Sequence, residues 1–122
     1  MNNWLWVFIG GGLGSVVRYA MSLGVLKFVE KPVFPWATFM ANMLACIVLG
    51  FLMKYGLNHP KDQWLRFFLI VGFCGGFSTF STFSYENMVL FKDGFMYTAI
   101  TNIIVSLLFG ILLVYLSSKQ LN

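Results

Sequence analysis

The stretch GFCGGFSTFSTFS, residues Gly72 to Ser84, lies inside a long apolar run, yet its composition is unlike that of a helix embedded in lipid. It holds three glycines and five hydroxyl side chains, and Phe77, Phe80 and Phe83 recur every three residues, roughly on one helix face. Glycines at membrane depth permit a break in the helix. Carbonyls freed by a break need partners from protein or ions, because hydrocarbon offers none. The stretch therefore predicts a chain that carries something through a membrane.

The rest of the chain also has the composition of a membrane protein. Of its 122 residues, 59% are hydrophobic and 10% are charged, whereas a soluble domain has about 25% charged residues. The mean hydropathy is +0.80. A helix needs about 20 apolar residues to cross the bilayer core. The chain therefore predicts one all-α unit over residues 1–122, with four membrane spans at about 4–28, 34–55, 64–91 and 95–116.

Several classes of function are excluded by what the sequence lacks. It contains no nucleotide-binding loop and no cluster of metal ligands, so it predicts no enzyme. The net charge of +4 is best explained by contact with anionic lipid headgroups. No nucleic-acid partner is expected.

The basic residues in the linkers, near the span ends and in the C-terminal tail are almost evenly divided between the two sides of the membrane. Four spans put four of them on the side of the chain ends and three on the opposite side. The first group is Lys54, Lys61, Arg66 and Lys119, and the second is Lys27, Lys31 and Lys92. The positive-inside rule needs an excess to fix one orientation. Two interpretations stay open: noise in one sequence, or a chain that inserts both ways and pairs antiparallel.

Arg18 is the costliest residue to place in a membrane. It lies about 20 Å along the first span at 1.5 Å per residue, and a central arginine costs at least about 2.5 kcal/mol on insertion scales. Its long stem can reach toward the headgroups. However, the glycine-rich stretch Gly10 to Ser15 favours close helix contact. We therefore expect Arg18 to face protein, where it caps carbonyls or presents positive charge to an anion in a vestibule.

Asn42 and Glu86 are two further polar residues within the spans. An amide in hydrocarbon usually joins helices through hydrogen bonds, but its N–H groups also suit an anion. Thr38 lies one turn before Asn42 on the same face. Glu86 lies only a few residues before Lys92. It is either an interfacial carboxylate or, if buried, a group that takes up and returns protons.

Phe80 and Phe83 differ from the other phenylalanines because hydroxyls are interleaved with them. An aromatic ring has a positive edge, and ring edges turned toward a small anion would stabilise it weakly. Conduction of several ions in succession requires such weak sites. In the last span, Thr98, Asn102 and Ser106 are spaced by four residues and form a sparse polar stripe.

Three stretches of the chain resemble the small four-helix fluoride channels called Fluc or CrcB-type proteins. They are GGGLGSVVRY (Gly10 to Tyr19), FPWATFMANMLACIVLG (Phe34 to Gly50) and GFCGGFSTFSTFSYE (Gly72 to Glu86). The third stretch is the most specific, because it is long and unusual in composition. The resemblance runs across nearly the whole chain.

This resemblance implies a multi-pass protein of a microbial cell membrane, the inner or plasma membrane, that exports fluoride passively and so protects the cytoplasm. It implies an antiparallel, dual-topology homodimer in the lipid bilayer, with the third helix broken in mid-membrane. Main-chain carbonyls of Gly75 and Ser78 from both copies would hold one structural sodium ion at the dimer centre. The implied fluoride-lining residues are Asn42, Phe80, Phe83, Ser81, Thr82 and Ser106. Arg18 and Glu86 would lie near a vestibule or a pore end.

Two other classes of function stay open on the sequence. A small multidrug-type secondary carrier can also be a four-helix chain that forms inverted dimers. Such a carrier needs a membrane carboxylate facing a roomy aromatic pocket, and Glu86 is the only candidate. A non-transporting assembly protein would use glycine and phenylalanine for packing alone, and the dense polar stretch argues against it.

Overall fold

The computed structural model of the chain describes residues 2–29, 33–54, 61 and 63–119. Four helical segments in this part are long and apolar enough to cross a membrane. They are α1 (Asn3–Phe28), α2 (Trp36–Lys54), a third segment over Gln63–Lys92, and α6 (Met96–Ser118). The prediction of an all-α chain with four candidate membrane helices is confirmed. Tyr55, the expected end of the second span, and Lys31, counted among the basic residues, lie outside the described residues.

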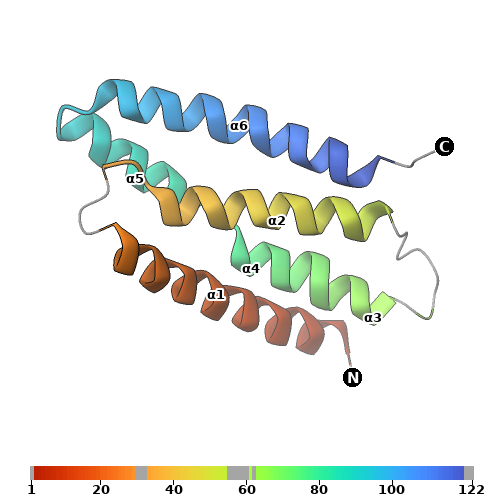
Figure 1. Cartoon of the computed structure of the whole chain (residues 1–122). Coiled ribbons are helices and arrows are strands. Elements are labelled where there is room, and N and C mark those ends of the chain that lie inside the picture. The colour runs from red at the N-terminus through yellow and green to blue at the C-terminus, as the bar shows by residue number, and fades with distance from the viewer. Residues whose placement is uncertain (1, 30–32, 55–60, 62, 120–122) are drawn as a thin grey trace.

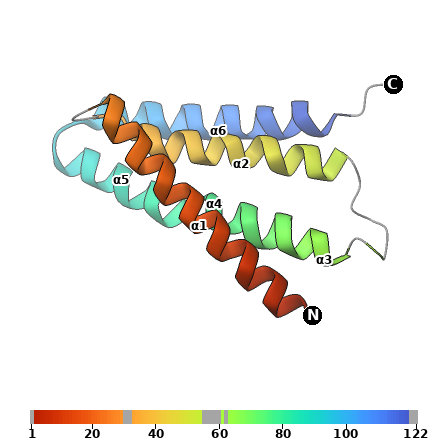
Figure 2. The ribbon, with the colours of Figure 1, turned by 60° about the horizontal axis from the view of Figure 1, so that its bottom comes forward.

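The four segments form an elongated bundle. The start of α1 and the end of α6 lie at the same end of it, as an even number of crossings requires (Figure 1). In the second view, α1 runs obliquely across the other segments (Figure 2). It packs mainly against the first half of the third segment, whereas α2 packs mainly against α6.

The third segment is interrupted. Its first half consists of α3 (Gln63–Arg66), the π-helical η2 (Phe67–Cys74) and α4 (Gly75–Phe77), and its second half is α5 (Phe80–Lys92). Between the halves, Ser78 (φ −84°, ψ 156°) and Thr79 (φ −153°, ψ 121°) have extended backbone. We call these two residues the break. The prediction that this stretch does not continue as one helix is confirmed. The break allows the first half to pack on α1 and the second half on α6.

Facing glycines let α1 and the first half of the third segment approach closely. Gly14 is buried, and a Cβ atom added to it would lie 2.8 Å from the backbone nitrogen of Phe77. A Cβ added to Gly72 would lie 2.9 Å from the carbonyl oxygen of Val7. Backbone atoms cannot turn aside as a side chain can. Gly10 and Gly14 of the first span therefore serve close helix contact, as expected from the sequence.

Side chains and one glycine define the ends of the helices. Oδ1 of Asn2 accepts a hydrogen bond from the N–H of Leu5 at 3.1 Å and caps α1. Thr79 caps α5 in the same way, through the N–H of Thr82. Between α5 and α6, Gly94 has a φ of +88°, a conformation that glycine adopts without steric cost.

The buried core of the single chain is small. Ala41 and Ala45 of α2 pack against Phe77, and the partly buried Met21 and Phe73 cover this cluster. Many other large apolar side chains are exposed. Such extensive exposed apolar surface is expected where lipid or another subunit covers the chain.

Candidate functional site

At the break, backbone groups exchange their helical partners for side chains. The N–H of Thr79 would pair with the carbonyl of Gly75 in a continuous helix, but it donates to Oδ1 of Asn42 at 2.9 Å. The N–H of Thr82 would pair with the carbonyl of Ser78, but it donates to Oγ1 of Thr79 at 3.2 Å. The carbonyls of Gly75 and Ser78 are thereby released from their usual helical partners.

Asn42 holds the break with both ends of its amide. While Oδ1 accepts from the N–H of Thr79, Nδ2 donates to the carbonyl oxygen of Thr79 at 3.5 Å. The amide thus pairs with an extended residue much as a neighbouring strand would. The prediction that Asn42 joins helices is confirmed, because it ties α2 to the third segment.

Arg18 also acts on the break. Its Nε donates to the carbonyl oxygen of Gly76 at 3.2 Å. In a continuous helix this carbonyl would pair with the N–H of Phe80, which instead begins α5. Of the two roles considered for Arg18, capping of a freed carbonyl is the one that this contact supports.

A cavity of about 250 Å³ lies beside the break, between α2, α5 and α6. Four of the predicted ion-lining residues meet at its wall: Asn42, Phe80, Phe83 and Ser106. The ring centroids of Phe80 and Phe83 are 6.3 Å apart and their planes are tilted by 36°. Phe80 is 79% exposed on the single chain. Residues that lie far apart in the sequence are therefore brought to one place.

The expectation that Phe77 shares a face with Phe80 and Phe83 is wrong. Phe77 is buried in the core against Ala41 and Ala45, whereas Phe80 and Phe83 line the cavity. The two extended residues between them reset the helical phase. A spacing of three residues therefore does not carry a common face across the break.

Ser81 and Thr82 do not line this cavity. Ser81 is exposed, and its Oγ lies 3.2 Å from Oγ1 of Thr79. Thr82 is half-buried, and its N–H is engaged by the cap of α5. The fluoride-lining roles suggested for these two residues stay predictions.

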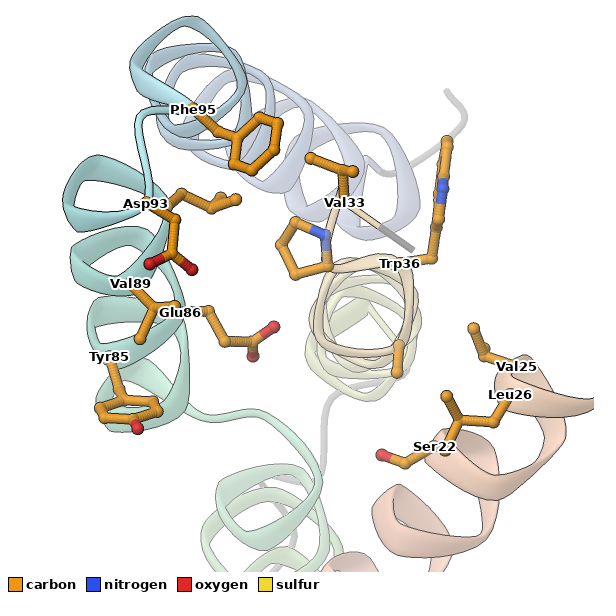
Figure 3. A pocket seen from close by; sticks show the side chains of 13 residues that line it. Ser22, Val25, Leu26, Val33, Trp36, Tyr85, Glu86, Val89, Asp93 and Phe95 are labelled. Atoms are coloured by element: carbon orange, nitrogen blue, oxygen red, sulfur yellow. The ribbon is translucent and has the colours of Figure 1, made fainter. Parts of the chain in front are cut away.

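Glu86 lies in a different and larger cavity of about 530 Å³, between α1, α2 and α5. Its side chain points into this space, which Ser22 and Asp93 also line (Figure 3). Its carboxyl group accepts a hydrogen bond from the hydroxyl of Thr38. The carboxyl group therefore faces a cavity whose wall includes Trp36, Tyr85 and Phe95, as the multidrug-type carrier would require. This cavity is separate from the 250 Å³ cavity beside the break, which we call the aromatic cavity.

Asn87 was missed by the sequence analysis. It is 5% exposed, and its Oδ1 accepts a hydrogen bond from Nδ2 of Asn102 at 2.9 Å. Oδ1 of Asn102 in turn accepts from the hydroxyl of Ser106 at 3.0 Å. One signal was available: Asn87 follows Phe83 by four residues and Phe80 by seven, which places all three on one face of α5.

The aromatic cavity suits a small anion that binds weakly. Its wall holds an amide, hydroxyl side chains and two phenylalanine rings, and none of the described residues that line it is charged. Amide and hydroxyl groups can donate hydrogen bonds to an anion, and a ring edge carries partial positive charge. Without a cationic side chain to trap it, a bound anion can leave readily.

Comparisons with known proteins agree with this chemistry. The family model described as "CrcB-like protein, Camphor Resistance (CrcB)" matches residues 5–118. A relative from Azobacteroides pseudotrichonymphae genomovar. CFP2, named "Fluoride-specific ion channel FluC", is 41% identical over 85% of this chain and 83% of its own length. Relatives of the same name from Bacteroides fragilis and Dehalococcoides mccartyi are 38% and 39% identical, over 93% and 97% of this chain and 91% of each relative. Given its length, identity and break, the chain belongs to the CrcB family.

Proposed function

We propose that this chain is the subunit of a fluoride channel, through which fluoride leaves a microbial cytoplasm down its electrochemical gradient. The observation that carries the proposal is the cavity beside the break, where Asn42, Phe80, Phe83 and Ser106 meet. The name shared by the relatives, fluoride-specific ion channel, supports the identity of the ion.

Fluoride fits the donors of this site. The ion is small and strongly hydrated, so short-range donors such as amide N–H and hydroxyl groups must replace its water. In the proposed path, Ser81 and Thr82 extend the hydroxyl track beyond the cavity, and Glu86 lies near one end. Arg18 contributes at a distance, because it holds the carbonyl of Gly76 and so keeps the break in place.

The proposed functional unit is an antiparallel homodimer. Phe80 is largely exposed on the single chain, although it lines the proposed path. Gly75 is exposed too, and a Cβ added to it would meet nothing within 4 Å. A second copy in the opposite orientation would cover both residues and complete the cavity wall. The nearly even division of basic residues supports insertion in both orientations.

The proposal includes a structural sodium ion at the centre of the dimer. The carbonyls of Gly75 and Ser78 fit a hard cation, because the N–H groups that would pair with them in a helix donate elsewhere. The hydroxyl of Ser78 turns back to the carbonyl of Cys74 at 2.7 Å, so the main-chain oxygen is the ligand expected from this residue. A bound cation would satisfy carbonyls that lipid cannot.

An efflux assay on purified protein tests the proposal. Liposomes that contain the protein and are loaded with fluoride should release it electrogenically, with little chloride efflux and no dependence on a proton or drug gradient. Phe80→Ile should reduce the rate, and Phe8→Ile is the matched control, because Phe8 is an exposed ring on α1. Absence of fluoride efflux from folded protein would contradict the channel. A pH response coupled to a drug gradient would favour the multidrug-type carrier instead.

A further inference from the structure

A chain of hydrogen bonds runs from a buried side chain of α5 to the wall of the aromatic cavity. Nδ2 of Asn102 donates to Oδ1 of Asn87 at 2.9 Å, and the hydroxyl of Ser106 donates to Oδ1 of Asn102 at 3.0 Å. Asn102 is 1% exposed and Asn87 is 5% exposed, whereas Ser106 lines the cavity. We call these three residues the amide relay.

The amide relay fixes the direction in which the Ser106 proton points. Because Asn87 presents Oδ1, the amide of Asn102 turns Nδ2 toward Asn87 and Oδ1 toward Ser106. A serine hydroxyl has one proton and two lone pairs. While its proton points to Oδ1 of Asn102, the hydroxyl offers only lone pairs to the cavity, and lone pairs repel an anion.

We propose that Asn87 and Asn102 are positioning residues that weaken the binding of fluoride by Ser106. This inference rests on the proposed fluoride channel. To donate to fluoride, the hydroxyl must leave Oδ1 of Asn102, so each ion that binds breaks one internal hydrogen bond. The internal bond forms again when the ion departs. The relay therefore favours departure of the ion, which conduction requires as much as entry.

Removing Oδ1 of Asn102, the acceptor that competes with fluoride for the Ser106 hydroxyl, should increase the affinity of the site for fluoride. In the Asn87→Leu/Asn102→Leu variant both amides are replaced by apolar side chains. Because the two amides bond to each other, replacing both leaves no buried amide without its partner. We expect the fluoride concentration that gives half-maximal efflux to fall about five-fold, the equivalent of one net hydrogen bond of about 1 kcal/mol. The maximal rate should fall as well, because the ion leaves more slowly.

A single substitution tests the same point without relying on the double substitution, and a second one serves as its control. Asn102→Ala removes the acceptor of the Ser106 hydroxyl and leaves Asn87 in place, so half-maximal efflux should again need less fluoride. Thr98→Val is the matched control. Thr98 lies two turns before Ser106 on α6, and its hydroxyl lines a separate cavity. Its removal should leave the half-maximal fluoride concentration unchanged.

The decisive measurement repeats the double leucine substitution in a Ser106→Ala background, where it should have no further effect. If the half-maximal concentration is unchanged in both relay variants while the wild type conducts, the relay proposal is overturned and the channel stands. A shift that persists in the Ser106→Ala background overturns it too, because the effect then does not pass through Ser106. A wild type that releases no fluoride overturns the channel itself.

Discussion

Replacing Gly14 by alanine tests whether the crossing of α1 and the third segment holds the break in place. The added Cβ would lie 2.8 Å from the backbone nitrogen of Phe77 and 3.1 Å from the carbonyl carbon of Phe73, and closer still to the oxygen of that carbonyl. Nonbonded carbon atoms are most stable at about 3.5–4.0 Å. The two helices must therefore separate by about 1 Å at this crossing.

The expected loss of stability in Gly14→Ala follows from two opposing effects. Overpacking a tight contact costs about 1–3 kcal/mol, and alanine in place of glycine returns up to about 1 kcal/mol of helix propensity. We expect a net loss of roughly 1–2 kcal/mol in the free energy of unfolding. Function should also fall, because Arg18 lies one turn after Gly14 and its 3.2 Å bond to Gly76 would be stretched.

The assay compares Gly14→Ala with Gly12→Ala, a substitution in the same helix whose Cβ meets nothing within 4 Å. Each purified variant is heated in detergent and the fraction that remains a single species is measured by size-exclusion chromatography, with fluoride efflux measured in parallel. Gly14→Ala should lose stability and flux, whereas Gly12→Ala should lose neither. Equal thermal midpoints and equal efflux for the two variants would refute the argument.

Three other substitutions probe separate parts of the site. Phe83→Ile should lower fluoride efflux several-fold while the protein still elutes as an intact assembly, and wild-type efflux would remove this ring from the path. Gly75→Val should leave the single chain folded but reduce the dimer fraction measured by crosslinking, because the added side chain meets no atom of its own chain; an undiminished dimer fraction would place Gly75 outside the interface. Asn42→Leu leaves the N–H and carbonyl of Thr79 without side-chain partners, which should lower the free energy of unfolding by about 1–3 kcal/mol and so lower the thermal midpoint. An unchanged midpoint would show that the hydrogen bonds between Asn42 and Thr79 add no stability.

Much of the fold could be predicted because the bilayer dictates it. Its thickness fixes the length of a span, so hydropathy predicted four helices that are long enough to cross it. Glycines and hydroxyls located the interruption because hydroxyl side chains can replace the helical partners of the backbone, as Oγ1 of Thr79 does for the N–H of Thr82. The prediction failed where periodicity was carried through the break, as the separate surroundings of Phe77 and Phe80 show.

The partners of the polar residues could not be predicted, because they depend on how the helices cross. An amide in hydrocarbon needs partners, which indicated that Asn42 would join helices, but the sequence could not show that the partner is the backbone of Thr79. Arg18 was expected to face protein, yet the carbonyl that it caps became evident only from the packing of α1. Asn87 is buried because of how α5 is rotated about its axis after the break. The residue spacing of the preceding helix does not determine this rotation.

The dependence of the break on α1 and α2 has a consequence for biogenesis. Proteins are synthesised from the N-terminus, so Arg18 and Asn42 reach the bilayer before the segment whose backbone they satisfy. A circularly permuted chain that begins with Gln63 would bring unsatisfied peptide groups into contact with acyl chains, at several kcal/mol for each group. We expect such a chain to stall during insertion or to be degraded, so the order of the segments in the gene is itself part of how this protein assembles.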